Sequence, residues 1–206
     1  GFCAGELKGR GFGIPRVFGT AHWLYVEPQS RGLGHGRHLA RVCIEYLASL
    51  GIDTETDEPV LIQADERYLV CGASGTGKSW ATRPLMAHAH MHGSVFLFDA
   101  KGEESIPWQG IIRVATETDE ILDGLDEVHA EMGRRKEEMR RRGISVWDGE
   151  QLTVQVDEGQ VVLSLVAGSG KSAKGRMQRL RELASLGRSR GVVLGWATQK
   201  PVMSPP

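Results

Sequence analysis

From about residue 60 onward, short apolar runs alternate with longer segments in which apolar residues recur every three or four positions. This alternation predicts an α/β fold, a mostly parallel sheet with helices on both faces. The apolar runs predict strands over 67–71, 94–99, 111–114, 152–156 and 191–197. The other pattern predicts helices after residue 78, over 119–142 with Ile121, Leu125, Val128 and Met132 on one face, and over 174–186.

Two places interrupt this pattern. Pro84 lies inside the helix expected after residue 78 and should kink or shorten it, because proline lacks the N–H that the helix needs. Residues 159–175 begin apolar and then become rich in glycine, serine and lysine, so we expect a flexible basic loop there.

The first 52 residues follow a different pattern. Extended runs over 2–9 and 17–26 precede a glycine-rich turn and a helix over about 36–50, which Gly51 should end. Residues 53–59 are acidic and poor in strand-forming residues, which is typical of a boundary. The sequence therefore predicts a small strand-loop-helix piece over 1–52 and a larger domain over 53–206. The chain starts at Gly1 and stops just after a strand-like segment, so we interpret it as a fragment.

Composition narrows the classes of protein. The chain has 206 residues, 40% of them hydrophobic, and a formal net charge of -1, which excludes a globally basic nucleic-acid binder. Three widely spaced cysteines argue against a disulfide framework or a structural zinc site. They favour a location of the protein in the reducing cytoplasm. No apolar run reaches the ~20 residues of a membrane-spanning helix. Any contact with the inner face of the membrane would need segments outside this sequence.

A complete phosphate-binding loop follows the strand predicted over 67–71. Its residues are Gly72, Ala73, Ser74, Gly75, Thr76, Gly77, Lys78 and Ser79. In such a P-loop, backbone N–H groups converge on the phosphates of a nucleotide, and glycines stand where a Cβ would obstruct them. We expect Lys78 to reach the β- and γ-phosphates of ATP and Ser79 to ligate Mg²⁺.

Hydrolysis also requires a carboxylate near the metal and a base for the water. Asp157 and Glu158 follow the strand predicted over 152–156 and fit these roles, with Asp157 near Mg²⁺ and Glu158 activating the water. Polar residues in that strand, Thr153 and Gln155, are unusual for a fully buried central strand. A second GSGKS over 168–172 has leucine where a P-loop has its first glycine, so we interpret it as a basic loop.

Two clusters of basic residues are candidates for nucleic-acid contacts. The stretch 171–190 contains seven lysines and arginines, which could face DNA phosphates, supply an arginine finger to a neighbouring subunit, or line a solvated helix face. The cluster over 134–142 is interleaved with glutamates at helix-pairing distances, which favours a solvated face.

Several ordered motifs resemble the FtsK/SpoIIIE-type DNA-pumping ATPases and related conjugative transfer proteins over about residues 56–203. They are Arg67-Tyr68-Leu69-Val70-Cys71-Gly72, Leu97-Phe98-Asp99-Ala100-Lys101-Gly102, Glu131-Met132-Gly133-Arg134-Arg135, Val156-Asp157-Glu158, Leu186-Gly187-Arg188-Ser189-Arg190-Gly191 and Ala197-Thr198-Gln199-Lys200-Pro201. Ala100 and Lys200 replace a proline and an arginine that are usual in the family.

The resemblance implies a RecA-like P-loop NTPase that assembles as a ring, a hexamer, around double-stranded DNA and couples ATP hydrolysis to DNA movement. In that scheme Gln199 senses the γ-phosphate, and Arg188 is the candidate finger that reaches across the subunit interface. The catalytic set is then Lys78, Asp157, Glu158, Arg188 and Gln199.

The N-terminal piece resembles instead the acetyl-CoA loop of GNAT N-acetyltransferases. The residues that carry the likeness are Gln29, Arg31, Gly32, Gly34 and Gly36, after the run Leu24-Tyr25-Val26-Glu27-Pro28. The resemblance implies pyrophosphate binding by backbone N–H groups at a helix start. It covers only the middle of that fold, so we expect an incomplete piece that lacks activity.

The leading hypothesis is an ATP-driven translocase of double-stranded DNA, in conjugative transfer or chromosome segregation. The alternative is an acetyl-CoA-dependent N-acetyltransferase with an appended nucleotide-binding domain. A third hypothesis is a degenerate fragment that binds nucleotide weakly and does no work.

Overall fold

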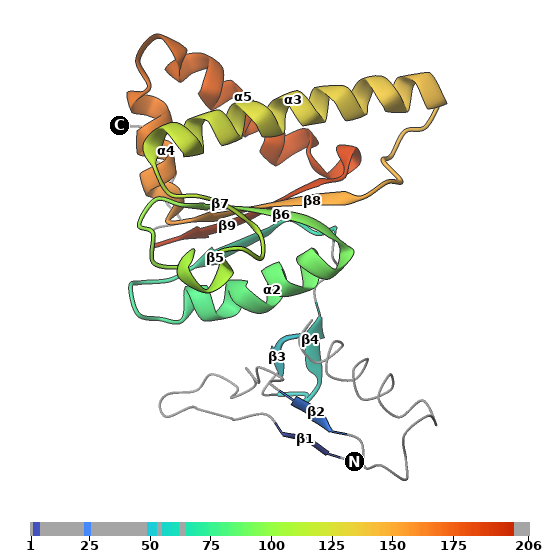
Figure 1. Cartoon of the computed structure of the whole chain (residues 1–206), viewed down its shortest axis with the longest axis vertical. Coiled ribbons are helices and arrows are strands. Elements are labelled where there is room, and N and C mark those ends of the chain that lie inside the picture. The colour runs from blue at the N-terminus through green and yellow to red at the C-terminus, as the bar shows by residue number, and fades with distance from the viewer. Residues whose placement is uncertain (1, 5–22, 26–48, 53–54, 62–64, 200–206) are drawn as a thin grey trace.

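The computed structural model describes residues 2–4, 23–25, 49–52, 55–61 and 65–199 (Figure 1). Two antiparallel strand pairs lie in the N-terminal part. They are β1 (Phe2–Ala4) with β2 (Trp23–Tyr25), and β3 (Ser49–Ile52) with β4 (Pro59–Leu61). No helix within the described residues is long and apolar enough to cross a membrane.

The centre of the molecule is a five-stranded sheet in which every neighbouring pair is parallel. Its order is β5 (Tyr68–Cys71), β9 (Val192–Thr198), β8 (Gln151–Asp157), β6 (Gly93–Asp99) and β7 (Arg113–Ala115). The mostly parallel sheet expected from the sequence is therefore confirmed. Because the strands are parallel, all their carboxyl ends lie along one edge of the sheet, which is where α/β proteins bind ligands.

Helices cover both faces of this sheet (Figure 1). Helix α2 (Lys78–His92) lies on one face, and α3 (Thr118–Arg142), α4 (Gly159–Gly168) and α5 (Ala173–Leu186) lie on the other. Each face of the sheet has its own hydrophobic core, and strand β6 contributes side chains to both. Val95 and Leu97 pack with α2, while Phe96 and Phe98 pack in the larger core with α3. This alternation is the period of two expected of a strand buried on both sides.

Helix α3 agrees with its sequence pattern. The four residues expected on its buried face, Ile121, Leu125, Val128 and Met132, are each at most 2% exposed. A capping box starts the helix, because the Glu120 carboxylate accepts hydrogen bonds from the backbone N–H groups of Thr116 and Glu117. Gly143 ends it in the left-handed conformation.

One expectation about the helices was wrong, and another was wrong in part. Residues 159–168 form helix α4 instead of a loop, because Val162 and Val166 are spaced by one turn and are both buried in the main core. Pro84 does not shorten α2, which continues to His92, and the kink expected at Pro84 stays a prediction. Packing of Met86 and Ala89 against the sheet stabilises the turns beyond the proline.

The N-terminal expectations are only partly covered by the described residues. The helix expected over 36–50 lies outside them up to residue 48, and its last two residues, Ser49 and Leu50, belong instead to strand β3. Gly51 also lies in β3, where pairing with β4 sets its conformation. Strands β3 and β4 flank residues 53–58, and Pro59 itself begins β4. The domain boundary expected over 53–59 stays a prediction.

Candidate functional site

The P-loop forms a tight turn between β5 and α2 at the carboxyl edge of the sheet. Its first residue is tied to the adjacent strand by a 3.2 Å hydrogen bond from the Gly72 N–H to the Thr198 carbonyl. A Cβ on Gly72 would lie 2.5 Å from Oγ1 of Thr76, so a larger residue there would have to displace the Thr76 side chain. Gly77 has a φ of 90°, which other residues rarely adopt, and α2 begins directly after it.

Lys78 is buried at the start of α2, and its ammonium donates a 3.0 Å hydrogen bond to the Ala73 carbonyl across the loop. Oγ1 of Thr76 donates to the same carbonyl at 2.8 Å. The lysine charge is thus held within the curve of the loop, next to the N-terminus of a 15-residue helix. A fixed ammonium and a helix N-terminus form a site for phosphate anions, so the residues present fit a nucleoside triphosphate.

Two aspartates end neighbouring strands at the same edge. Asp99 and Asp157 are paired in register as the last residues of β6 and β8. Burial, together with the negative charges of Asp99, Glu104 and Glu158, raises the pKa of Asp157 to about 6. A buried carboxylate among other carboxylates is stabilised by a cation, as expected of a metal ligand.

Ser79, the second residue of α2, is the other candidate ligand for Mg²⁺. No group of three or more histidines, cysteines, aspartates and glutamates is arranged to hold a metal in the part of the chain that the structure describes. Mg²⁺ commonly binds through one or two protein groups plus substrate phosphates. The donor set of Ser79 and Asp157 fits that mode of binding, with the nucleotide supplying the remaining oxygens.

Glu158 turns the chain sharply from β8 into α4 and has a φ of 52°. The next residue, Gly159, packs against Trp196. A Cβ on Gly159 would lie 2.1 Å from the indole ring. Oε1 of Glu158 accepts two hydrogen bonds of 2.8 Å, from the ammonium of Lys101 and from the amide of Gln199. Burial alone would raise the pKa of Glu158, but these two donors and the charge of Lys101 outweigh it and lower the pKa.

The structure therefore brings together four of the five catalytic candidates at one edge of the sheet: Lys78, Asp157, Glu158 and Gln199. Arg188 is not among them. It lies in the 3₁₀ turn η4 (Arg188–Arg190), directly before the amino end of β9, and so at the opposite edge of the sheet. There its guanidinium forms an exposed ion pair with Asp65 at 3.0 Å.

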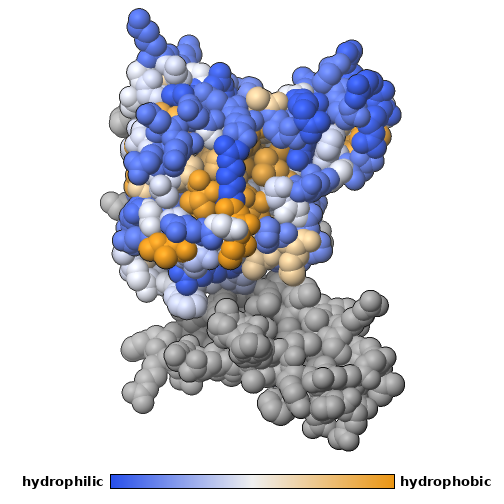
Figure 2. All heavy atoms as spheres, in the orientation of Figure 1, coloured by the Kyte–Doolittle hydropathy of each residue, from blue (hydrophilic) through white to orange (hydrophobic). Residues whose placement is uncertain are grey.

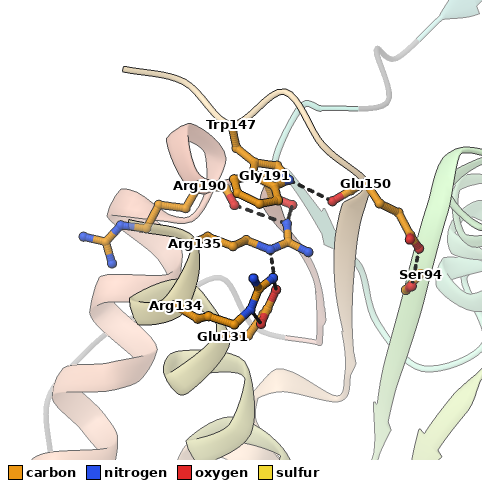
Figure 3. Close-up of polar contacts among 8 residues, drawn as sticks. All are labelled: Ser94, Glu131, Arg134, Arg135, Trp147, Glu150, Arg190 and Gly191. Carbon is orange, nitrogen blue, oxygen red and sulfur yellow. Dashed lines mark hydrogen bonds and ion pairs between the residues drawn. The ribbon is translucent and has the colours of Figure 1, made fainter. Parts of the chain in front are cut away.

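A polar cluster fixes η4 in place (Figure 3). Arg135 of α3 is buried and donates hydrogen bonds to the carbonyls of Arg190 and Gly191, at 3.2 and 2.8 Å. The ring of Trp147 packs over the same guanidinium, and Glu131 accepts a 2.7 Å hydrogen bond from it. Hydrogen bonding to Arg134, supported by Arg135, lowers the pKa of Glu131 to about 2. The turn that carries Arg188 is therefore rigidly joined to α3.

The two basic clusters differ in how their charges are used. On α3, the arginines at 134, 140 and 141 each pair with a glutamate one turn earlier, as expected of a solvated face. On α5, Arg176 and Arg179 both pair with Asp126 of α3 and so hold the two helices together. Other basic residues of the stretch 171–190 are exposed and have no ion pair within the described part of the chain. They include Lys171, Lys174 and Arg181.

A cavity of about 920 Å³ opens between α3 and the strands β6 and β7. It is lined by apolar side chains such as Ile112 and by charged ones such as Arg113. Figure 2 shows hydrophobic residues exposed in the middle of one face, bordered by hydrophilic ones. The residues that line it include the amino ends of β6 and β8 and none of the P-loop. It is therefore separate from the phosphate site.

The roles of Asp99 and Lys101 were not predicted, although both residues lie in a motif that carries the family resemblance. Their spacing to Asp157 and Glu158 along the chain gives no signal, because strand order alone brings them together. The candidate acetyl-CoA residues over 29–36 lie outside the described residues.

Comparison with known proteins identifies relatives of this chain. The sequence model of the FtsK/SpoIIIE family matches residues 45–186. Protein Tra of Streptomyces lividans is 36% identical over 172 residues, which are 76% of this chain and 28% of Tra, so the chain spans little more than a quarter of that relative. The comparisons do not support the acetyltransferase-like segment or acetyl-CoA binding.

Among solved structures, the monomer form of the pCW3 conjugation coupling protein TcpA with ATPγS has a TM-score of 0.58 and 21% identity, over 70% of this chain and 46% of TcpA. The cytoplasmic domain of the Thermomonospora curvata type VII secretion ATPase EccC has a TM-score of 0.57 and 24% identity, over 75% of this chain and 21% of EccC. These likenesses confirm the RecA-like P-loop fold. With its P-loop, acidic edge and ordered motifs, the chain belongs to the FtsK/SpoIIIE family.

Proposed function

We propose that this chain is the ATP-hydrolysing motor domain of a protein that moves double-stranded DNA in conjugative transfer. The observation that carries the proposal is the convergence of Lys78, Asp157, Glu158 and Gln199 at one sheet edge. A P-loop alone binds nucleotide, whereas a P-loop beside an ionised, anchored glutamate can also activate water.

Each residue has a defined role in this mechanism. The loop over 72–77 and Lys78 bind the phosphates, and Ser79 and Asp157 would hold Mg²⁺. When bound, Mg²⁺ neutralises charge on the β- and γ-phosphates. Glu158 accepts a proton from the attacking water, and Gln199, one residue beyond β9, registers the state of the γ-phosphate.

The position of Arg188 supports a ring with shared sites. Strand β9 has seven residues, so Arg188 lies roughly 20 Å from the Gln199 end of the same strand, at ~3.3 Å per residue. No arginine side chain spans that distance, so Arg188 cannot act on the nucleotide of its own chain. It can act as a finger only in a neighbouring subunit, as in a closed hexamer.

Two observations support DNA as the cargo and conjugation as the setting. Exposed Lys171, Lys174 and Arg181 give α5 and the turn before it a local positive charge on a chain with a net charge of -1. TcpA, which shares this fold, is a conjugation coupling protein that was solved with an ATP analogue. That likeness favours conjugative transfer over chromosome segregation.

ATPase assays with and without duplex DNA test this proposal. We expect the parent chain to hydrolyse ATP, duplex DNA to stimulate turnover, and Lys78→Ala to abolish it. Lys136→Ala, which removes an exposed lysine on α3, is the matched control and should keep parental turnover. If Lys78→Ala retains ATP turnover, the P-loop is not the source of that activity. ATP turnover that is the same with and without duplex DNA would contradict the motor function.

A further inference from the structure

Lys101 lies in a loop that Asp99 holds in one conformation. The Asp99 side chain is fully buried, and its two carboxylate oxygens accept hydrogen bonds from the backbone N–H groups of Lys101, Gly102 and Ser105, at 3.2, 3.0 and 2.7 Å. Three charge-assisted hydrogen bonds to one carboxylate fix the backbone of the loop. The position from which the Lys101 side chain extends is therefore set by the end of β6.

From this loop, Lys101 reaches the end of the next strand. Its ammonium lies 2.8 Å from Oε1 of Glu158, and the amide of Gln199 lies 2.8 Å from the same oxygen on the other side. These donors follow β6 and β9, the two strands that flank β8. Glu158 is thus held between its neighbours by one oxygen, and its second oxygen, Oε2, receives no hydrogen bond from the described residues.

The same loop is joined to the nucleotide-binding helix. Glu104 accepts hydrogen bonds of 3.0 and 3.3 Å from the guanidinium of Arg83, which lies in α2 five residues after Lys78. The side chains of this pair are 31% and 15% exposed, so water screens the pair only partly. A continuous set of contacts therefore runs from the P-loop helix through the loop to Glu158.

We propose that Lys101 is a positioning residue for ATP hydrolysis: it anchors Oε1 of Glu158 so that Oε2 is left to accept the proton of the attacking water. This inference rests on the proposed ATPase function. In the step, the water oxygen bonds to the γ-phosphorus, the bond from that phosphorus to the bridging oxygen of ADP breaks, and the water proton moves to Oε2. Lys101 donates throughout and transfers no proton.

Steady-state kinetics of three variants test the role. Lys101→Met keeps the length of the side chain and removes its charge, and we expect kcat to fall about tenfold while KM stays within twofold, because only alignment of the base is lost. Lys101→Arg keeps a charged donor and should restore most of kcat. Lys136→Met on α3 is the control. Parental kcat in Lys101→Met, or a rise in KM alone, would overturn the proposal.

A double-mutant cycle separates positioning from a general structural effect. In single-turnover assays, Lys101→Met should cause no further loss in a Glu158→Gln background, since both changes remove the same function. A further tenfold loss there would show that Lys101 acts elsewhere.

The contact can also be tested without hydrolysis. Urea unfolding of the parent, both single variants and the double variant should give midpoint shifts that are not additive. Additive shifts would overturn the anchoring of Glu158, even if the chain hydrolysed no ATP. If the parent chain hydrolyses no ATP and the midpoint shifts of the variants are still non-additive, the proposed function is overturned. The contact between Lys101 and Glu158 is then still supported.

Discussion

The hydroxyl of Tyr68 in β5 donates a 2.6 Å hydrogen bond to Oε1 of Gln155 in β8, across the intervening strand β9. Gly195 of β9 is in register with both residues, and a Cβ on it would lie within 2.5 Å of both polar groups. The bond explains how a central strand tolerates a polar residue that is 1% exposed. Burial also raises the pKa of Tyr68 above its ordinary value.

We expect Tyr68→Phe to lower the free energy of unfolding by about 1–2 kcal/mol, because it leaves the buried Gln155 oxygen without its partner. Gly195→Ala should cost more, since its methyl group would displace the hydrogen-bonded pair. Urea denaturation of the nucleotide-free chain measures both. Tyr68→Phe is the smaller change in shape, so a greater loss in it than in Gly195→Ala would contradict this account.

A mixing experiment tests whether Arg188 acts between subunits. Lys78→Ala and Arg188→Ala should each abolish ATP turnover alone, and mixing them should restore part of it, because some interfaces then combine an intact P-loop with an intact Arg188. Arg141→Ala, which removes an exposed arginine of α3, is the control and should be active alone. A mixture as inactive as its components would place Arg188 outside the catalytic interface.

Asp157 should make the metal-free chain less stable as the pH rises. Its folded-state pKa of about 6 exceeds the ordinary 3.8, so the native state keeps a proton that the unfolded chain has released between these values. Stability therefore falls as the pH rises through that window. Asp157→Asn should be more stable than the parent at pH 8, by up to about 3 kcal/mol, and equal to it below about pH 4.

Thermal unfolding in the presence of a chelator measures this difference. Asp123→Asn, which changes an aspartate whose side chain is 81% exposed, should show no comparable gain. A parent chain as stable as Asp157→Asn at pH 8 would mean that burial and the neighbouring carboxylates do not raise this pKa. In ATPase assays with Mg²⁺, Asp157→Asn should be inactive despite its greater stability.

The P-loop and most strands could be predicted because their signals are local. Eight consecutive residues define the loop, and the ends of β6, β8 and β9 each differ from the predicted ranges by no more than one residue. Helix α4 was not predicted because its apolar start gives way to residues rich in glycine, serine and lysine, which favour a loop. Only burial of Val162 and Val166 on one side shows the helical period.

The surroundings of Glu158 could not be predicted, because they depend on the order of strands in the sheet. Lys101 lies 57 residues from Glu158 along the chain and Gln199 lies 41 residues away, yet each donates to the same oxygen. Sequence spacing carries no record of which parallel strands become neighbours. The opposite position of Arg188 likewise follows from the direction of β9 and not from its motif.

Arg188 lies in η4, just before the amino end of strand β9, and Gln199 directly follows the carboxyl end of the strand. An extended strand paired on both sides can shift or tilt, but it can hardly stretch. In the proposed ring, β9 would thus connect two consecutive nucleotide sites at a fixed distance. Because η4 is bound to α3, a displacement of Gln199 as one γ-phosphate leaves would move β9 and α3 together, and Arg188 with them, so that the subunits hydrolyse ATP in succession around the ring.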